Sequence, residues 1–523
     1  MADICLIFEV HQPFRLKRNF DVISRKSVSA KDLYEIYFDQ EVNREIFMRV
    51  AERCYFPAGE IILEQMDKMR NEKKPFKVSF SFSGTFIEQC EMWKPDLIDL
   101  FKQMVNTGCV ELLAQTYYHS LASLNNLDKV EFIEQIELHR QAIEDVFNYT
   151  PKTFENTECI YNNEIAKIVE EMKFKTIVTE GADRILGWRS PNYVYRAKNA
   201  SIRILLRNYR LSDDIGFRFT STQWDQWPLT ADKYAAWLAH TPGQVITLFL
   251  DYETFGEHYW AESGILEFLR WLPLEVSKWE NLCWSIPSEA AHKHPPCGEI
   301  EVPPDKTISW ADAERDVSAW LSNPQQNISF NMLYEAGLLV KEINDPDLLK
   351  IWRYLQASDH FYYMYTKGGE SGIVHDSFNP YGSPVEAFIT YISILIDFEA
   401  RCRAESIKPE FKFKRLLRRV PPDKGFRFFL RFAYPTDILV TSLEEFYEAI
   451  KNVNIESIIF HLNRGDFERW ISNVIGDGDL AARMVRLPRV WRKREDARKA
   501  LLLILEERLK ELRTLSREDK NAL

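Results

Sequence analysis

Short apolar runs recur along the first half of the chain, and each of them ends in polar residues. A continuous apolar run of this length is typical of a strand that is buried on both faces of a parallel sheet. Segments with helical periodicity separate the runs. The pattern predicts seven strands, at Ile4–Val10, Lys77–Phe82, Val110–Thr116, Lys152–Thr157, Thr176–Thr179, Arg203–Asn208 and Val245–Leu250.

Seven strand–helix units within about 250 residues predict an α/β fold, a distorted TIM-like (β/α)7 barrel. A doubly wound open sheet is the competing layout, but no glycine-rich phosphate loop supports it. Between the third and fourth strands, Asp128 is the expected cap of a helix. The expected buried stripe of this helix consists of Val130, Ile133, Ile136, Ile143 and Val146.

Helical periodicity dominates after Gly256. Ser309 with Asp312 resembles a capping box, and Ser383-Pro384-Val385-Glu386 is a stronger one because proline suits the first helical position. Trp310–Arg403 is therefore expected to form a helical layer that packs on the barrel. The sequence predicts three domains: a catalytic barrel at 1–290, a helical domain at 291–420 and a small C-terminal α+β domain of unknown function at 421–523.

The C-terminal domain follows a linker-like segment, Pro421–Gly425. A strand is expected at Phe426–Phe432, then a helix that Ser442 and Glu445 cap. A further strand is expected at Ser457–His461, and a charged amphipathic helix at Lys493–Leu515.

Composition narrows the function classes. The 523 residues are 46% hydrophobic, and 67 basic against 78 acidic residues give a net charge of −11. An acidic chain argues against a general nucleic-acid binder, and no apolar run is long enough to suggest a membrane span. The eight cysteines form no CxxC pair, and no secretory signal is evident, so a cytoplasmic location is expected. A homo-oligomer stays possible.

Two carboxylates follow predicted strands, Glu158 after the fourth and Asp251 after the seventh. In a barrel, these strands open onto one mouth, so the two side chains can converge. Paired carboxylates are the minimum equipment for cleaving a glycosidic bond, with separations of about 5–5.5 Å for retention and roughly 6.5–9.5 Å for inversion. In so acidic a chain, however, two such residues are also commonly structural.

Several polar and aromatic residues near these strand ends are candidate substrate contacts. His11 and His119 suit sugar hydroxyls, although a buried histidine bonded to backbone is the ordinary alternative. Glu253 is expected on the same side as Asp251, to tune it or to bind substrate. Trp224, Trp227 and Trp260 are candidates for stacking on sugars, although core packing is the default role of a tryptophan. The spacing of His and Asp forms no compact ligand set, so neither a catalytic metal nor another cofactor is expected.

Five segments, in fixed order, resemble the signature regions of glycoside hydrolase family 57, particularly its α-amylase members. Together they span about residues 1–400. They are His11-Gln12-Pro13, Glu111 to His119, Phe154-Glu155-Asn156-Thr157-Glu158, Leu250 to His258, and Ser358 to Met364.

The resemblance implies a (β/α)7 barrel, retention of anomeric configuration, α-glucan substrates and no required metal. It assigns the nucleophile to Glu158 and the acid/base to Asp251. Its fourth and fifth regions add His258, Asp359 and His360 as substrate-binding residues. The segment at 421–523 resembles a small domain that is appended to carbohydrate-active proteins.

The leading hypothesis is a cytoplasmic retaining hydrolase of α-1,4 links in starch, glycogen or maltodextrins. A 4-α-glucanotransferase or branching enzyme would use the same chemistry with another sugar as acceptor. A non-catalytic glucan-binding protein and a metal-dependent deacetylase are the alternatives from other classes.

Overall fold

The computed structural model describes residues 1–18, 20, 28–127, 129–368, 375, 378–406, 415–488 and 490–518. The chain divides into two compact units. The first comprises Met1–Glu335 and Asp347–Ile396, and the second comprises Ala336–Pro346 and Asp397–Leu523. The expected cap Asp128 lies outside the described residues.

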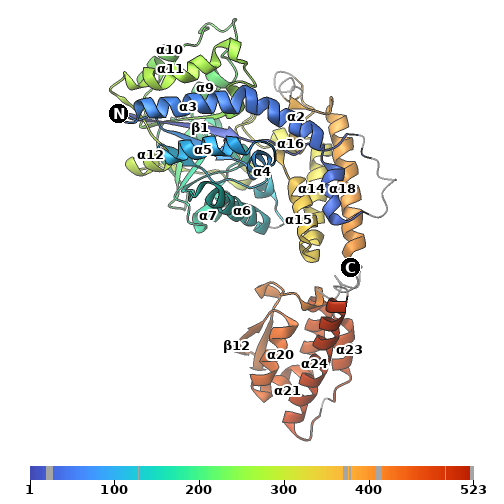
Figure 1. Ribbon diagram of the computed structural model, residues 1–523. Coiled ribbons are helices and arrows are strands. Elements are labelled where there is room, and N and C mark those ends of the chain that lie inside the picture. The colour runs from blue at the N-terminus through green and yellow to red at the C-terminus, as the bar shows by residue number, and fades with distance from the viewer. Residues whose placement is uncertain are drawn as a thin grey trace. The chain divides into compact units, whose positions relative to one another are not determined.

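Seven parallel strands form the centre of the first unit (Figure 1), and all seven expected strands are confirmed. The third and fourth strands are shorter than expected, at three residues each. The strands are β1 Ala2–Val10, β2 Val78–Phe82, β3 Val110–Leu112, β4 Thr153–Glu155, β5 Thr176–Glu180, β7 Arg203–Arg207 and β8 Val245–Asp251.

The strand pairing closes into a ring, in the order β1, β2, β3, β4, β5, β7, β8 and back to β1. The join between β3 and β4 is a parallel bridge from Ala114 to Phe154. In this bridge the Ala114 amide donates to Thr153, and the Glu155 amide donates to Ala114, each at 2.9 Å. The chain therefore forms the expected (β/α)7 barrel.

Three short strands add to the barrel and distort it. β9 Leu282–Trp284 pairs with β1, β6 Tyr195–Ala197 runs antiparallel to β7, and β10 Glu299–Ile300 extends from β6. The strand residues are almost all buried, as expected for a sheet that is covered on both faces.

Helices cover the outside of the barrel, where α3 packs on α5 and α11, and α10 packs on α11 (Figure 1). The apolar faces of α2, α3, α4, α5, α10 and α11 join β1, β2, β3 and β8 in one large core. The covering helices include α2 Gln40–Val50, α3 Phe56–Met69, α4 Gly84–Trp93, α5 Pro95–Asn106, α6 Val130–Phe147, α7 Asn163–Glu171, α9 Tyr209–Gly216, α10 Ala231–His240, α11 Ile265–Ser277 and α12 Pro287–Lys293.

Two local predictions are wrong in detail. In α6, Val130 is exposed. The buried stripe instead contains four apolar residues, Phe132, Ile136, Ile143 and Phe147, and three polar ones, Glu131, Gln135 and His139. The buried face of α6 is therefore determined by hydrogen-bond partners in the barrel as well as by hydrophobicity.

Ser309 starts no helix, because its hydroxyl donates to the Asp316 carbonyl and closes a loop. The next helix, α13, spans only Ser318–Leu321. The helices that follow are α14 Pro324–Ile343, α15 Pro346–Tyr354, α16 Ser358–Tyr362 and α18 Pro384–Ser406. The second capping box is confirmed, since Ser383 Oγ accepts from the Glu386 amide.

The second unit has its own core, in which helices pack on a two-stranded antiparallel sheet. The predicted strand at Ser457–His461 is wrong. Its apolar residues recur at Ile455, Ile458, Ile459 and Leu462, which is helical spacing, and they lie on α21. The elements are β11 Phe426–Arg431, β12 Tyr434–Val440, α20 Leu443–Asn452, α21 Ile455–Arg464, α22 Asp466–Trp470, α23 Gly478–Val485 and α24 Arg494–Glu518.

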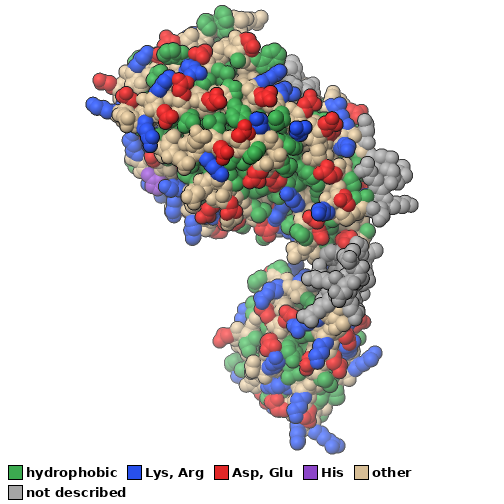
Figure 2. Space-filling view, viewed as in Figure 1, with side chains coloured by type: hydrophobic (Ala, Val, Ile, Leu, Met, Phe, Trp, Pro, Cys, Tyr) green, Lys and Arg blue, Asp and Glu red, His purple; other side chains and the backbone are tan. Residues whose placement is uncertain are grey.

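Acidic and basic side chains intermingle on the face shown in Figure 2, over both units. Among the described helices, none is both long and apolar enough to cross a bilayer.

Candidate active site

Glu158 lies on a one-turn helix, Thr157–Cys159, directly after β4. Its backbone has φ of 61°, and the neighbouring Cys159 has φ of 53°. His119, in the loop after β3, has φ of 48°. Left-handed backbone costs a side-chain-bearing residue of the order of 1–3 kcal/mol, and such residues cluster at functional sites. Surrounding contacts must therefore hold this turn in place.

Both carboxylate oxygens of Glu158 accept hydrogen bonds. Trp310 Nε1 donates to Oε2, and Ser358 Oγ donates to Oε1, each at 2.7 Å. His119 Nε2 lies 3.5 Å from Oε1. The donors come from three separate parts of the chain and all favour the charged form of the acid.

The charge state of Glu158 follows from these contacts. Burial opposes ionisation, but hydrogen bonding and charge from His119, with Trp310 and Ser358, outweigh it and hold the pKa of Glu158 below its ordinary value. Burial also disfavours the charged form of His119, yet Glu158 and Glu9 raise the pKa of that imidazole to about 9. At neutral pH Glu158 is an anion beside an imidazolium.

Asp251 is the last residue of β8, and its surroundings favour the protonated form instead of the charged one. Burial raises its pKa to about 7, and the negative charge of Glu158 adds to this shift. The loop that follows passes close to the helical turn at Arg53. Only glycine permits this approach, because a Cβ on Gly256 (φ 136°) would collide with the Arg53 carbonyl. Glu158 is thus near enough to influence Asp251, and below neutral pH the first is ionised while the second is largely protonated.

His11 links the first strand to the helical segment after the barrel. Its Nε2 lies 2.8 Å from Asp359 Oδ2, and its Nδ1 lies 2.7 Å from Ser83 Oγ. The ring stacks on His119 with centroids 4.0 Å apart. Burial, then the charge of His119, lowers the pKa of His11 to about 4. A neutral His11 therefore donates to Asp359 and accepts from Ser83.

Beneath the two histidines lies a buried acid pair, Glu9 of β1 and Glu155 of β4. Gln115 Nε2 donates to Glu9 Oε1 at 2.8 Å, and its Oε1 lies 2.9 Å from His119 Nδ1. Ser81 Oγ donates to Glu155 at 3.0 Å. Burial raises the pKa of Glu155 to about 8, and burial with the charge of Glu155 raises the pKa of Glu9. The pair holds at least one proton at neutral pH.

We expect Glu155→Gln to flatten the pH dependence of stability. An unfolded glutamate titrates near pH 4.3, so from there to about pH 8 only the unfolded state is ionised at this position, and stability falls by about 1.4 kcal/mol per pH unit. The amide removes this loss. In thermal melts, the melting temperature of the variant relative to wild type should rise from pH 5 to pH 8. The exposed Glu137→Gln on α6 is the control, and a difference that stays constant with pH contradicts the prediction.

A second charge cluster fixes the loop that carries Trp310. Arg207, at the end of β7, donates to Glu180 at 3.0 Å and to Asp213 at 2.6 Å. Arg315 donates to Asp213 at 2.8 Å and to the Trp310 carbonyl at 2.6 Å. The Trp310 indole also stacks on Phe249 of β8, with centroids 5.1 Å apart. The loop is thereby tied to the barrel, and the indole N–H points to Glu158.

We expect Trp310→Phe to lower kcat/KM by about 10–100-fold, because a hydrogen bond to a charged group contributes about 1.5–3 kcal/mol. The phenyl ring keeps the packing on Phe249. Losing the donor should raise the pKa of Glu158 and move the acidic limb of the pH–rate profile to higher pH. The control is Trp188→Phe, at an indole that is 95% exposed. An unmoved acidic limb with unchanged kcat/KM would disprove this positioning role.

The other predicted substrate-binding residues, Glu253, His258, Trp260 and His360, each have their own contacts. Tyr55 OH donates to Glu253 at 2.5 Å, and burial, with the charge of Asp251, raises the pKa of Glu253 to about 8. His258 packs edge-on against Phe378, and burial lowers its pKa to about 4.

Trp260 is 62% exposed, with the Arg53 guanidinium over its ring. His360 is buried, with Nε2 3.3 Å from the Tyr354 carbonyl. The structure thus gathers His11, His119 and Asp359 around Glu158, sets Glu253 beside Asp251, and engages His258, Trp260 and His360 with other side chains.

Several residues of the site were not among the candidates that the sequence suggested. Glu9 carries a usable signal, since it is a charged residue within an otherwise apolar strand. Glu155, Gln115 and Arg207 sit at strand ends, but nothing local distinguishes them from structural residues. Trp310 and Ser358 lie in segments that reach Glu158 only through the fold. Within the described part of the chain, no three His, Cys, Asp or Glu side chains are arranged to hold a metal ion.

Comparison with known proteins identifies the family to which the chain belongs. The sequence profile of Glycosyl hydrolase family 57 matches residues 5–303. A putative alpha-amylase of Methanocaldococcus jannaschii is 48% identical over 412 residues, which are 77% of this chain and 85% of that protein.

Solved structures share the fold at low identity. The 4-alpha-glucanotransferase of Thermococcus litoralis superposes with a TM-score of 0.55 and 16% identity, over 82% of this chain and 61% of that one. A branching enzyme of Pyrococcus horikoshii superposes with a TM-score of 0.51 and 12% identity, over 77% and 94%. The profile match and the close relative together show that this chain belongs to glycosyl hydrolase family 57, a family of glycoside hydrolases.

Proposed function

We propose that this enzyme cleaves α-1,4-glucosidic bonds in starch, glycogen or maltodextrins by a retaining double displacement. The observation that carries the proposal is the contrast between the surroundings of the two carboxylates: three donors face Glu158, whereas Asp251 ends a buried strand. A retaining enzyme needs an anion as nucleophile and a protonated acid beside it. Glu158 is held ionised by three donors, and Asp251 has its pKa raised to about 7.

In the first step, a Glu158 oxygen forms a bond to the anomeric carbon while the glycosidic C–O bond breaks. Asp251 gives its proton to the departing oxygen. In the second step, Asp251 takes a proton from water, the water oxygen bonds to the anomeric carbon, and the Glu158 carboxylate leaves. Asp251 is thereby reprotonated, and the enzyme returns to its starting state.

The surrounding residues support these steps. His119 balances the charge of Glu158, and Trp310 and Ser358 orient it. We propose that His11, His119, Glu253 and Asp359 bind sugar hydroxyls near the scissile bond, and that His258 and Trp260 contribute further along the glucan. The buried His360 would act only as the neighbour of Asp359.

The barrel of residues 1–290 carries the catalytic carboxylates, and the segment 291–420 completes the site with Trp310 and Ser358. All eight cysteines are free thiols, which supports the proposed cytoplasmic location.

A 4-α-glucanotransferase or a branching enzyme is the second candidate, since the T. litoralis and P. horikoshii neighbours carry those names. The same glycosyl-enzyme would be released by a sugar hydroxyl instead of by water. Chromatography of the products from maltoheptaose separates the two. We expect only shorter oligosaccharides, with one new reducing end for each bond cleaved. Oligosaccharides longer than the substrate, without a net gain of reducing ends, would assign transfer instead.

A further inference from the structure

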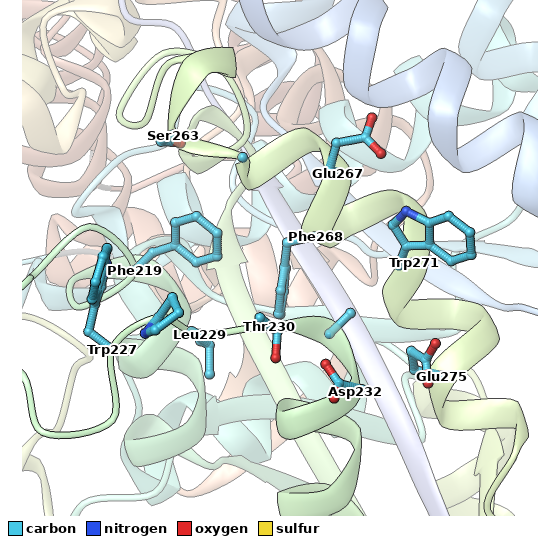
Figure 3. A pocket seen from close by; sticks show the side chains of 13 residues that line it. Phe219, Trp227, Leu229, Thr230, Asp232, Ser263, Glu267, Phe268, Trp271 and Glu275 are labelled. Atoms are coloured by element: carbon cyan, nitrogen blue, oxygen red, sulfur yellow. The ribbon is translucent and has the colours of Figure 1, made fainter.

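A pocket of about 420 Å³ lies between α10 and α11, on the outer layer of the barrel. Its lining includes Trp227, Thr230 and Asp232 before and within the start of α10, and Glu267, Phe268 and Trp271 on α11. None of the residues that contact Glu158 or Asp251 lines it. Figure 3 shows the two indoles on opposite sides of the view, with Phe268, Thr230 and Asp232 between them. The pocket is therefore separate from the paired carboxylates.

Both indoles of the pocket are about half exposed. Trp227 is 47% exposed and Trp271 is 52% exposed, whereas Phe268, which lies between them in Figure 3, is only 4% exposed. Indoles that frame a concave surface around a buried phenyl ring leave flat apolar faces in water, which is unfavourable without a ligand. The pocket thus offers apolar faces to a partner with a flat C–H surface.

The polar groups of the pocket narrow the chemistry further. Asp232, Glu267 and Glu275 supply carboxylates, and Thr230 and Ser263 supply hydroxyls. Among the described lining residues, none is Lys, Arg or His. Glu267 and Glu275 are paired outside the lining with cations one turn along α11, yet each carboxylate can accept further hydrogen bonds. A ligand with O–H donors fits, and a phosphate or other anion is repelled.

A bare cation is also disfavoured, because the described acids here form no group of three that is arranged to hold a metal ion. What combines flat C–H faces, many hydroxyl donors and no charge is a pyranose chain. The cavity volume falls within the roughly 300–1,000 Å³ that small-ligand sites span, which suits a short stretch of oligosaccharide.

We infer that this pocket is a second, non-catalytic glucan-binding site. Trp227 and Trp271 stack on sugar faces, and Asp232 and Glu267 accept hydrogen bonds from hydroxyls. The identity of the sugar as an α-glucan rests on the proposed function. Holding one part of a long polymer here raises the effective concentration of its other segments at the active site. A short oligosaccharide, which cannot engage both sites, gains nothing.

The test compares Trp227→Ala/Trp271→Ala with the matched control Trp188→Ala, which removes an exposed indole elsewhere. Binding is measured by affinity electrophoresis in gels containing glycogen, in a Glu158→Gln background so that the polymer is not digested. Turnover of glycogen and of maltotriose is measured in proteins with Glu158 intact. Thermal melts check that the exposed positions tolerate alanine.

We expect glycogen retention to weaken by about tenfold or more in the double variant, with a matching rise in KM for glycogen. Maltotriose turnover should stay within about twofold of wild type. If the double variant is retained by glycogen as strongly as the control, the proposed binding site is wrong. It is also wrong if the double substitution changes only the oligomeric state, as measured by gel filtration.

The two proposals fail separately. If glycogen is retained through these tryptophans but no glucan is turned over, the pocket stands and the catalytic proposal falls. If glucans are turned over but the double substitution does not change glycogen retention, the catalytic proposal stands and the second binding site falls.

Discussion

Glu158→Gln should lower kcat on maltoheptaose by roughly 10⁴-fold or more, because an amide cannot bond to the anomeric carbon and leave again. The amide has nearly the shape of the carboxylate and can still accept from Trp310 or Ser358, so folding should survive. Glucan binding should persist, since the contacts of His11 and Asp359 do not depend on the carboxylate charge.

The control for this variant is Glu164→Gln, a nearby glutamate on α7 whose side chain is 46% exposed. It should keep wild-type kcat. Initial rates of reducing-end release measure both proteins, and binding to immobilised glycogen separates catalysis from affinity. A Glu158→Gln enzyme with more than about a tenth of wild-type activity would remove Glu158 from the nucleophile role.

Asp251→Asn should lower kcat on maltoheptaose by about 10²–10⁴-fold, the usual contribution of a general acid/base. The loss should depend on the leaving group. With a 2,4-dinitrophenyl α-maltoside, the phenolate departs without protonation, so the first step should slow by less than about tenfold. The second step still lacks its base, and one equivalent of dinitrophenolate should appear as a burst.

The pH dependence gives Asp251 a second readout. Because burial raises its pKa to about 7, the acid is protonated below neutrality and lost above it. Wild-type kcat/KM should therefore fall as the pH rises through about 7, and this basic limb should vanish in Asp251→Asn. The exposed Asp96→Asn serves as control. A variant that keeps the basic limb, or that loses equal activity on both substrates, contradicts the assignment.

The barrel was predictable because each strand is a buried, apolar run whose signal is local. Strands such as Val245–Asp251 have their polar ends at the same mouth in any parallel barrel, so topology alone predicts that Glu158 and Asp251 face one another. Ser457–His461 shows the limit of this argument. A short apolar run suits a helix as well as a strand, and only its extension to Leu462 reveals the helical spacing.

The protonation states were not predictable from the sequence. They depend on Trp310, Ser358 and His119, which reach Glu158 from positions 152, 200 and 39 residues away along the chain. Arg315 holds the Trp310 loop through Asp213, and no local pattern encodes that contact. Likewise, Trp227 was a candidate for stacking on its own, but its partner Trp271 appears only where α10 packs on α11.

The most direct test of the central claim is to trap the glycosyl-enzyme. With 5-fluoro-α-glucosyl fluoride, fluoride leaves readily, but the C5 fluorine slows both oxocarbenium-like steps, so a covalent adduct accumulates. Mass spectrometry of the digested protein should find one 5-fluoroglucosyl group, on the peptide that contains Glu158 and on its carboxylate. A label on Asp251, or inactivation without any label on Glu158, would contradict the account.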